Sequence, residues 1–297
     1  MATVYKSWAA LGLSTTMLGS LGLAACGNEA AAPASETAAP APAETEAESQ
    51  TAEQASPAPS NVISSDGESG GEGGEGEGGE GGVNIAAAAE DPAVYLSALA
   101  LVEAHIRAGI DALDAGEREA AGEMFAHPVS EILFDLQPVL EQQGVEPFEQ
   151  KLIEASHAAF GDETSEELRA RADDIIATIR AAGEAAPDSE ESMTIVKVRV
   201  VADEIDRAIS QYSSAHGNDA YEPYLDGYGF YKTAEAMLND NADAIETEAP
   251  ALAAQMGSII EALGEAYPTA TRPETLDADA SALAIMNSGL QLELSAL

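Results

Sequence analysis

Residues 95–113 read YLSALALVEAHIRAGIDAL, and this stretch decides the fold class. Its large apolar side chains recur at steps of three and four residues, which is the spacing of one face of an α-helix. A second run, from Phe125 to Leu140, has the same spacing. Further periodic runs occupy residues 148–160, 168–179, 195–212, 224–238, 245–263 and 283–292. We therefore predict an all-α protein, an antiparallel bundle of about seven or eight helices with short loops.

The expected helix ends agree with this periodicity. Thr164 and Glu167 have the spacing of a capping box, in which each side chain caps a backbone N–H at the helix start. Residues 195–201 alternate like a strand and are mostly β-branched. However, Val198, Val201 and Ile205 continue a helical stripe, and no second strand is available to pair with this one. We predict a helix here as well.

The N-terminus has the features of an export signal. Residues 1–25 hold one positive charge near the start, then a short apolar stretch that ends in Leu23-Ala24-Ala25-Cys26. This ending resembles the lipobox of bacterial lipoproteins. The resemblance implies that Cys26, the one cysteine, is lipidated and anchors the protein to a membrane, facing the periplasm. Gly27 follows in place of Asp, which implies sorting to the outer membrane.

Residues 26–88 should form a disordered acidic linker, because Ala, Pro, Ser, Gly and Glu dominate them and large apolar side chains are scarce. The helical bundle domain is expected over residues 89–297. The whole chain has 12 Lys plus Arg against 53 Asp plus Glu, a formal net charge of −41. Such a charge argues against a nucleic-acid partner, which needs a basic face. A single cysteine excludes a disulfide framework and a cysteine-type zinc site.

One candidate metal site lies on the second helical run. His127, Glu131 and Asp135 are four residues apart, so on a regular helix the imidazole and the two carboxylates share one side and could bind one ion. The same projection places His127 opposite the apolar stripe of this helix, which favours the alternative of a solvated face. Pro128 either kinks the helix or begins it.

A cluster of tyrosines provides the second candidate site. Tyr221, Tyr224, Tyr228 and Tyr231 fall on one helical face together with Glu235. Phenolate and carboxylate oxygens are hard ligands that suit ferric iron. The alternative is that these tyrosines pack at the margin of the core, with each hydroxyl bound to a backbone or water partner.

Residues 224–230, Tyr-Leu-Asp-Gly-Tyr-Gly-Phe, together with residues 202–205 on the preceding helix, resemble a motif of the extracytoplasmic helical region that accompanies bacterial high-affinity iron permeases. The layout of an anchored export signal before a helical bundle is also similar to imelysin-like iron-uptake proteins. Two departures are Pro223, where those relatives carry Glu, and the extra residue between His127 and Glu131. The resemblance implies iron, ferric or ferrous, as the ligand and an iron permease as a partner.

We therefore expect a lipid-anchored protein that binds or presents metal, with iron implied by the resemblance, as an accessory to uptake. Its predicted ligands are His127, Glu131, Tyr224, Asp226, Tyr228, Glu103 and Asp203. His105, at the margin of its apolar stripe, is a weaker candidate. The alternative function is a structural or protein-interaction lipoprotein whose acidity suits a saline habitat. We do not expect an enzyme, because no nucleophile has a neighbouring base.

Overall fold

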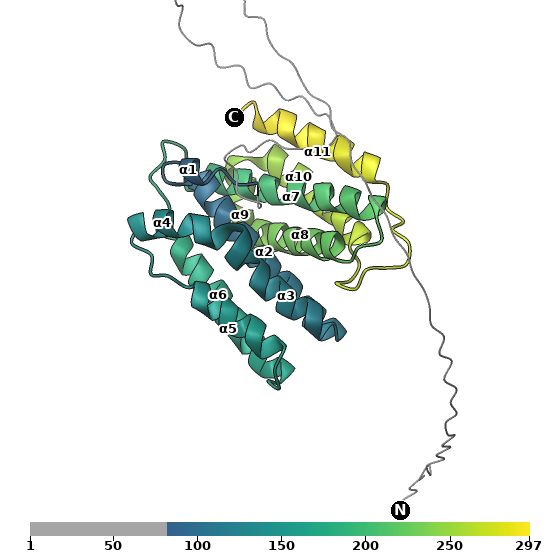
Figure 1. Cartoon of the computed structure of the whole chain (residues 1–297). Helices are drawn as coiled ribbons and strands as arrows, with labels where there is room; N and C mark the ends of the chain where they lie inside the picture. The colour runs from purple at the N-terminus through teal and green to yellow at the C-terminus, as the bar shows by residue number, and fades with distance from the viewer. Residues whose placement is uncertain (1–81) are drawn as a thin grey trace, which may run out of the picture. The chain divides into compact units, whose positions relative to one another are not determined.

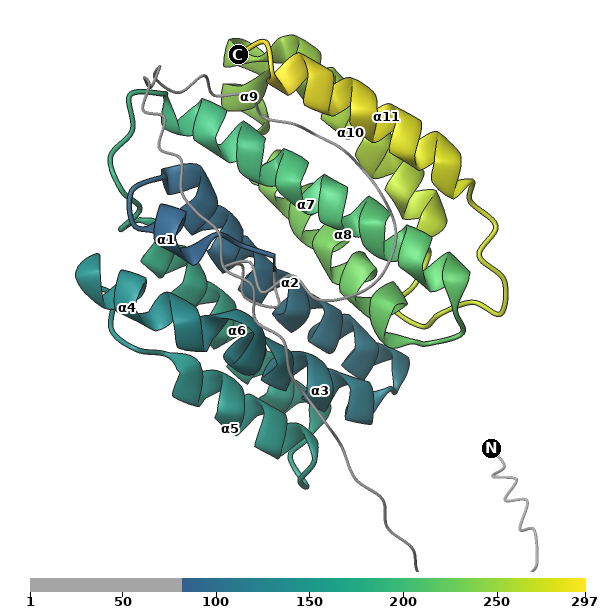
Figure 2. The same ribbon diagram turned by 45° about the horizontal axis from the view of Figure 1, so that its top comes forward.

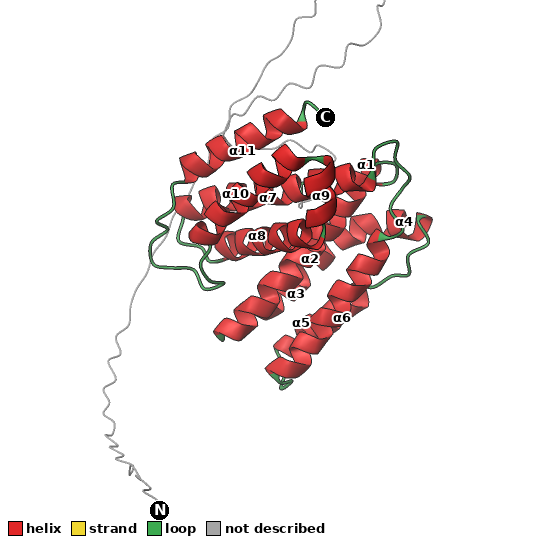
Figure 3. Cartoon of the chain, turned by 180° about the vertical axis from the view of Figure 1, so that it is seen from behind, coloured by secondary structure: helices red, strands yellow, loops and turns green. Residues whose placement is uncertain are grey.

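The computed structural model describes residues 82–297, and these residues form helices joined by loops, with no strand among them. The fold is an all-α helical bundle (Figures 1 and 3). In chain order its elements are α1 (Ile85–Ala88), α2 (Pro92–Ala115), α3 (Arg118–Pro128), the π-helix η1 (Val129–Leu133), α4 (Phe134–Gln142), α5 (Glu149–Ala159), α6 (Ser165–Gly183), α7 (Met193–Gly217), α8 (Glu222–Asp240), α9 (Ala242–Glu248), α10 (Pro250–Ala266) and α11 (Ala280–Leu294).

The helices form two groups that meet at α2. Figure 2 shows α2 to α6 on one side of the bundle and α7 to α11 on the other. Helix α2 packs against α3 and α6 in its own group and against α7 and α8 in the second group. By length and composition α2 could cross a membrane, but 78% of its most apolar stretch is buried inside the bundle. It is therefore the central helix of the core, which explains why it is apolar on nearly every side.

The periodic runs lie in helices, except that Phe148 and Phe160 flank α5, and two runs are interrupted. Residues 195–201 belong to α7, which confirms the helical prediction, and the capping box of Thr164 and Glu167 is present at the start of α6. The run from residue 245 breaks between α9 and α10, where Pro250 begins the second helix. The run from residue 125 divides into α3, η1 and α4. Pro128, which has no N–H to donate, ends α3 immediately before η1.

The packed part of the chain begins earlier than residue 89. Val83 is buried, and α1 packs against α2 although its residues fall in the predicted linker. The predicted signal peptide of residues 1–25, the lipidation site Cys26 and most of the linker lie outside the described residues.

Glycines allow α8 to approach α2 closely. A Cβ added to Gly229 would overlap the backbone carbonyl oxygen of Ala104 on α2, and one added to Gly227 would overlap the Tyr267 hydroxyl. The absence of a side chain at Gly229 thus brings the backbones of α8 and α2 together, and its absence at Gly227 leaves room for Tyr267. Ala104 precedes His105, and Asp226 lies one turn before Gly229, so this contact sets the distance between the imidazole and the carboxylate.

Candidate metal centre

His105 lies at the centre of the bundle, where α2 faces both α3 and α8. Its side chain is 4% exposed, and its Nδ1 lies 2.9 Å from the carbonyl oxygen of Leu101. Because a carbonyl can only accept, Nδ1 carries a proton and donates it to Leu101. The ring packs edge-on against Phe230 of α8, with ring centres 6.0 Å apart. These contacts fix the ring and direct Nε2 toward η1 and α8.

Two carboxylates face the Nε2 atom of His105. Glu131 Oε2 of η1 is 3.3 Å away, and Asp226 Oδ1 of α8 is 3.7 Å away. With Nδ1 protonated, a neutral ring would direct its Nε2 lone pair at two negative charges. This arrangement is stable only if a cation occupies the space between them, either a proton on Nε2 or a metal ion.

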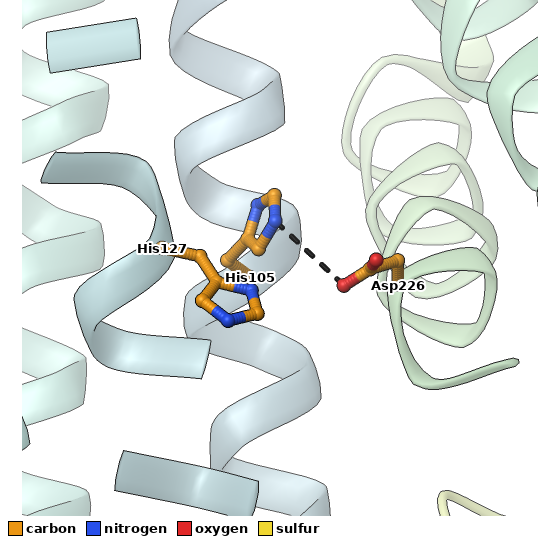
Figure 4. A group of neighbouring side chains, drawn as sticks. All are labelled: His105, His127 and Asp226. Carbon is orange, nitrogen blue, oxygen red and sulfur yellow. Dashed lines mark ion pairs between the residues drawn. The ribbon is translucent and has the colours of Figure 1, made fainter. Parts of the chain in front are cut away.

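His127 adds a second imidazole from the end of α3. Its ring centre is 5.9 Å from that of His105, and its Nδ1 lies 3.7 Å from Glu131 Oε1. Figure 4 shows the two rings and the Asp226 carboxylate reaching the same space from three different helices. One donor atom from each of His105, His127 and Asp226 lies within 4.8 Å of the others. We call these three residues and Glu131 the His–carboxylate cluster.

Two donor atoms of the cluster lack a hydrogen bond although they are buried. His127 Nδ1 and Asp226 Oδ1 make no hydrogen bond. A buried polar atom without a partner costs free energy, and such atoms are uncommon in folded proteins. Here both belong to residue types that bind metals, so a metal ion would satisfy them. The residues present therefore fit a metal ion.

The pKa values of the cluster reflect competition between burial and opposite charge. Burial alone would lower the pKa of His105, but the hydrogen bond with Glu131 and the charges of Asp226 and Glu131 outweigh it and raise that pKa above 6.5. Burial opposes the ionisation of Glu131 too, yet the same bond and both imidazoles hold its pKa below the usual value. For Asp226 burial dominates and raises the pKa to about 6. The cluster thus holds protons that a metal ion would displace.

A cavity of about 460 Å³ leads to the cluster. His105, Glu131, Asp226 and Phe230 line it on one side. Helix α7 provides polar groups on another side, namely Asp203, Asp206, Arg207, Ser210 and Gln211. The cavity is large enough for a hydrated ion, so the cluster has an entry path as well as donor atoms.

The structure brings together three of the predicted ligands, His127, Glu131 and Asp226, with His105 added. Asp135, grouped with His127 in the sequence, is exposed on α4. The regular helix assumed for residues 125–140 is wrong, because the wider turn of η1 shifts the side chains after Val129 relative to those before it. Short π-helices of this kind often occur at functional sites. As a result His127 and Glu131 face α2, whereas Asp135 faces solvent.

The structure does not bring Tyr224 or Tyr228 to the cluster. The Tyr224 hydroxyl donates to the carbonyl oxygen of Thr269 over 2.8 Å, and that of Tyr228 donates to Asp111 over 2.8 Å. Their rings surround Tyr267, with Tyr224 at 5.1 Å and Tyr228 at 6.5 Å between ring centres. Burial raises the pKa of both phenols, which opposes the phenolate that a ferric site would need. These tyrosines pack in the core, as the alternative interpretation held.

The two remaining predicted ligands also lie apart from the cluster. Glu103 is 5% exposed and binds two guanidinium groups, Arg107 at 2.6 Å and Arg180 at 3.0 Å. Its charge is fully engaged, so it is not a ligand of this site. Asp203 lines the cavity but accepts a hydrogen bond from Arg207 over 3.1 Å. It can attract a cation toward the cluster without being one of its central donors.

The sequence contains a signal for His105, although its place at the margin of the apolar stripe made it only a weaker candidate. The residue lies within a helix that is apolar on most sides, and such a helix is buried. An imidazole on such a helix must find polar partners within the core. Asp226 is such a partner, on a helix with small residues for close packing.

A search for relatives finds no matching protein-family model, no matching curated protein and no matching solved structure. The similarity of residues 224–230 to the region that accompanies iron permeases therefore stays a prediction.

Proposed function

We propose that this protein binds a divalent transition-metal ion at His105, His127, Glu131 and Asp226. We further propose that it is a lipoprotein anchored through Cys26 to the outer membrane and facing the periplasm, and that it presents the ion as an accessory to uptake. An iron permease is the partner that the sequence resemblance implies.

One observation carries the metal proposal. The lone pair of His105 Nε2 and two carboxylate oxygens converge on one point within 3.7 Å of the nitrogen. In water these groups would each be solvated, but at this depth they need a shared cation. His127 Nδ1 adds one more donor, from α3, and neither this nitrogen nor Asp226 Oδ1 makes a hydrogen bond.

The donor set favours a divalent ion over ferric iron. Two imidazoles with one or two carboxylates suit ferrous iron, zinc or manganese. The hard phenolate donors expected for ferric iron are instead hydrogen-bonded in the tyrosine-lined core. Ferrous iron is thus the form of iron that the proposed site would hold.

The charge of the chain supports this function at longer range. After residue 82 the 41 acidic residues outnumber the 11 basic ones by 30. Such an excess raises the local concentration of cations at the surface, and added salt screens the effect over about 10 Å at 0.1 M ionic strength. Capture of a cation should therefore be faster at low salt, while retention depends on the cluster.

Calorimetric titration of the mature chain with ferrous iron under anaerobic conditions, zinc and manganese tests the proposal. We expect saturable binding of one ion per chain. The variant His105→Gln should lose this binding, whereas His157→Gln should keep it, because His157 is exposed on α5 and forms no hydrogen bond or ion pair with a residue of the cluster. Binding that survives in His105→Gln would place the ion on surface carboxylates. Absence of saturable binding by all three ions would favour the alternative, an interaction lipoprotein with a salt-adapted surface.

A further inference from the structure

A second cavity, of about 730 Å³, lies between α2, the end of α6, the α6–α7 connection, the start of α7 and the end of α8. None of its lining residues also lines the cavity of the His–carboxylate cluster. Its volume is in the range of sites that bind small organic molecules. The metal proposal makes no use of this cavity.

The floor of the cavity is apolar. Side chains from three helices form it, and they are Leu96, Leu99, Ala100, Ile179 and Met237. Gly183, the last residue of α6, also lines the cavity, and an added Cβ there would lie 3.3 Å from Leu96. The glycine therefore keeps this wall open. A branched aliphatic side chain would be removed from water on such a floor.

Lys197 of α7 provides an ammonium group without a carboxylate partner. The structure describes three lysines, and Lys151 and Lys232 both form ion pairs. The Lys197 ammonium instead donates to the side-chain oxygen of Asn241 over 2.9 Å, and no carboxylate of residues 82–297 lies within 4.0 Å of it. In a chain with so many acids, a half-buried lysine without a counter-ion is unusual. It leaves two N–H donors for an anionic group in the cavity.

Most other charges around the cavity are already paired. Arg180 binds Glu103 and Asp240, at 3.0 and 3.3 Å, and Glu191 binds Arg199 at 2.8 Å. Two acids remain, Glu184 and Asp188 of the α6–α7 connection, and both are exposed. They lie where the cavity meets solvent, whereas Lys197 is half-buried. The cavity thus offers one cationic group without a carboxylate partner, an apolar floor and an anionic rim.

This combination selects a ligand that carries both charges. A simple carboxylate would satisfy Lys197, but the large negative charge of the protein would repel it. A simple amine would meet the rim acids, but it would leave Lys197 without a partner. A zwitterion with an apolar side chain has no net charge to be repelled, and it can place its carboxylate at Lys197 and its ammonium at the rim.

We propose that this cavity binds a free amino acid with a branched aliphatic side chain. The carboxylate accepts hydrogen bonds from Lys197, the ammonium faces Glu184 and Asp188, and the side chain lies on Leu96, Leu99 and Met237. This binding site is independent of the metal site, and each can fail without the other.

Calorimetric titration of the mature chain with L-leucine tests this proposal, with a chelator present so that metal plays no part. Two analogues test the two charged groups of leucine separately: 4-methylpentanoate lacks the ammonium, and 3-methylbutylamine lacks the carboxylate. We expect saturable binding of leucine and at least about tenfold weaker binding of each analogue, because each loses a charge-assisted contact. Lys197→Gln should weaken leucine binding by about tenfold. Lys151→Gln, the same charge change at the exposed ion pair with Asp174, should leave it unchanged.

Three results would overturn the proposal. The first is no saturable binding of leucine, and the second is binding of 3-methylbutylamine as tight as that of leucine. The third is unchanged leucine binding in a Lys197→Gln variant whose helical circular dichroism is that of the unmodified protein. If that variant fails to fold, the comparison of the three ligands on the unmodified chain still decides the question.

Discussion

Helix α8 contributes to two polar clusters that differ in how completely their hydrogen bonds are satisfied. On one side its tyrosines pack around Tyr267, and each phenol has a partner: Tyr221 donates to Ala270 over 2.9 Å and Tyr224 to Thr269 over 2.8 Å. On the other side Asp226 meets His105 and His127, and neither Asp226 Oδ1 nor His127 Nδ1 makes a hydrogen bond.

This difference separates a polar core from a binding site. A satisfied cluster gains free energy from its own bonds and has nothing left to offer a ligand. An unsatisfied buried cluster is a cost to the apo protein, which a bound cation can remove. Both clusters consist of residues that can bind metal, so residue type alone does not distinguish them. Variants should therefore affect metal binding on one side of α8 and only stability on the other.

The largest effect is expected from Asp226→Asn, which keeps the shape of the side chain but removes its charge. We expect metal affinity to fall at least about 100-fold, because loss of a direct ligand should exceed the 10–100-fold effect of removing an outer partner. The apo protein should not be destabilised, because burial already disfavours the ionised Asp226 carboxylate. Calorimetry with zinc and urea unfolding in a chelator measure the two quantities. A large loss of apo stability would show that Asp226 has a structural role instead.

The contact between α8 and α2 provides the next test. Gly229→Ala should lower the free energy of unfolding by about 1–3 kcal/mol, because the new methyl group overlaps the Ala104 carbonyl. Separation of the helices should also weaken metal binding. Gly257→Ala on α10 is the matched control: its Cβ meets nothing within 4 Å, so it should stabilise the protein by about 0.5–1 kcal/mol. Urea unfolding of both variants checks these values, and equal effects would contradict the close approach.

Periodicity predicted the all-α bundle because helix formation here depends on local spacing. The predicted ligand set was less complete, for two physical reasons. The π-helix at Val129–Leu133 breaks the regular projection that placed His127 on the solvated face. In addition, the partner of His105 is 121 residues further along the chain, on a helix whose approach depends on Gly229. Such a long-range contact has no trace in local spacing.

For the tyrosines, helical spacing predicted the position of the side chains but not their hydrogen-bond partners. They do share one helical face, as predicted, but that face was compatible both with metal binding and with packing in the core. The deciding partners, the carbonyl oxygens of Thr269 and Ala270, belong to a loop with no periodic signal. Whether each tyrosine hydroxyl finds a hydrogen-bond partner thus depends on the tertiary structure and cannot be predicted from helical spacing.

The pH dependence should distinguish the apo from the metal-bound cluster. Metal binding must displace protons from His105, whose pKa is raised, and from Asp226, whose pKa is about 6. Metal affinity should therefore fall by about tenfold or more for each pH unit below 6. Calorimetric titrations at several pH values in non-chelating buffers measure this slope. Affinity that does not change between pH 5 and 8 would exclude these two groups as ligands.

The stability of the apo protein should change with pH in the opposite direction. A raised His105 pKa stabilises the folded state while the ring is protonated, and this contribution disappears as pH rises through the folded pKa. Asp226 acts in the same sense, because its folded pKa lies above its unfolded value. Glu131, with a lowered pKa, stabilises the folded state above about pH 4.5 and does not change between pH 6 and 8. Urea unfolding in a chelator should show a smaller pH dependence over this range in His105→Gln than in the unmodified protein.

The smallest effect is expected on the satisfied side of α8, from Tyr224→Phe. The variant keeps the ring that packs on Tyr267 and loses only the bond to Thr269, so it should cost about 1 kcal/mol in the free energy of unfolding. Metal affinity should stay within about twofold of the unmodified protein, because the phenol reaches no atom of the cluster. Urea unfolding and zinc calorimetry measure both quantities on one preparation. A large loss of metal binding with little loss of stability would make the phenol a ligand after all, and the distinction between the two sides of α8 would no longer hold.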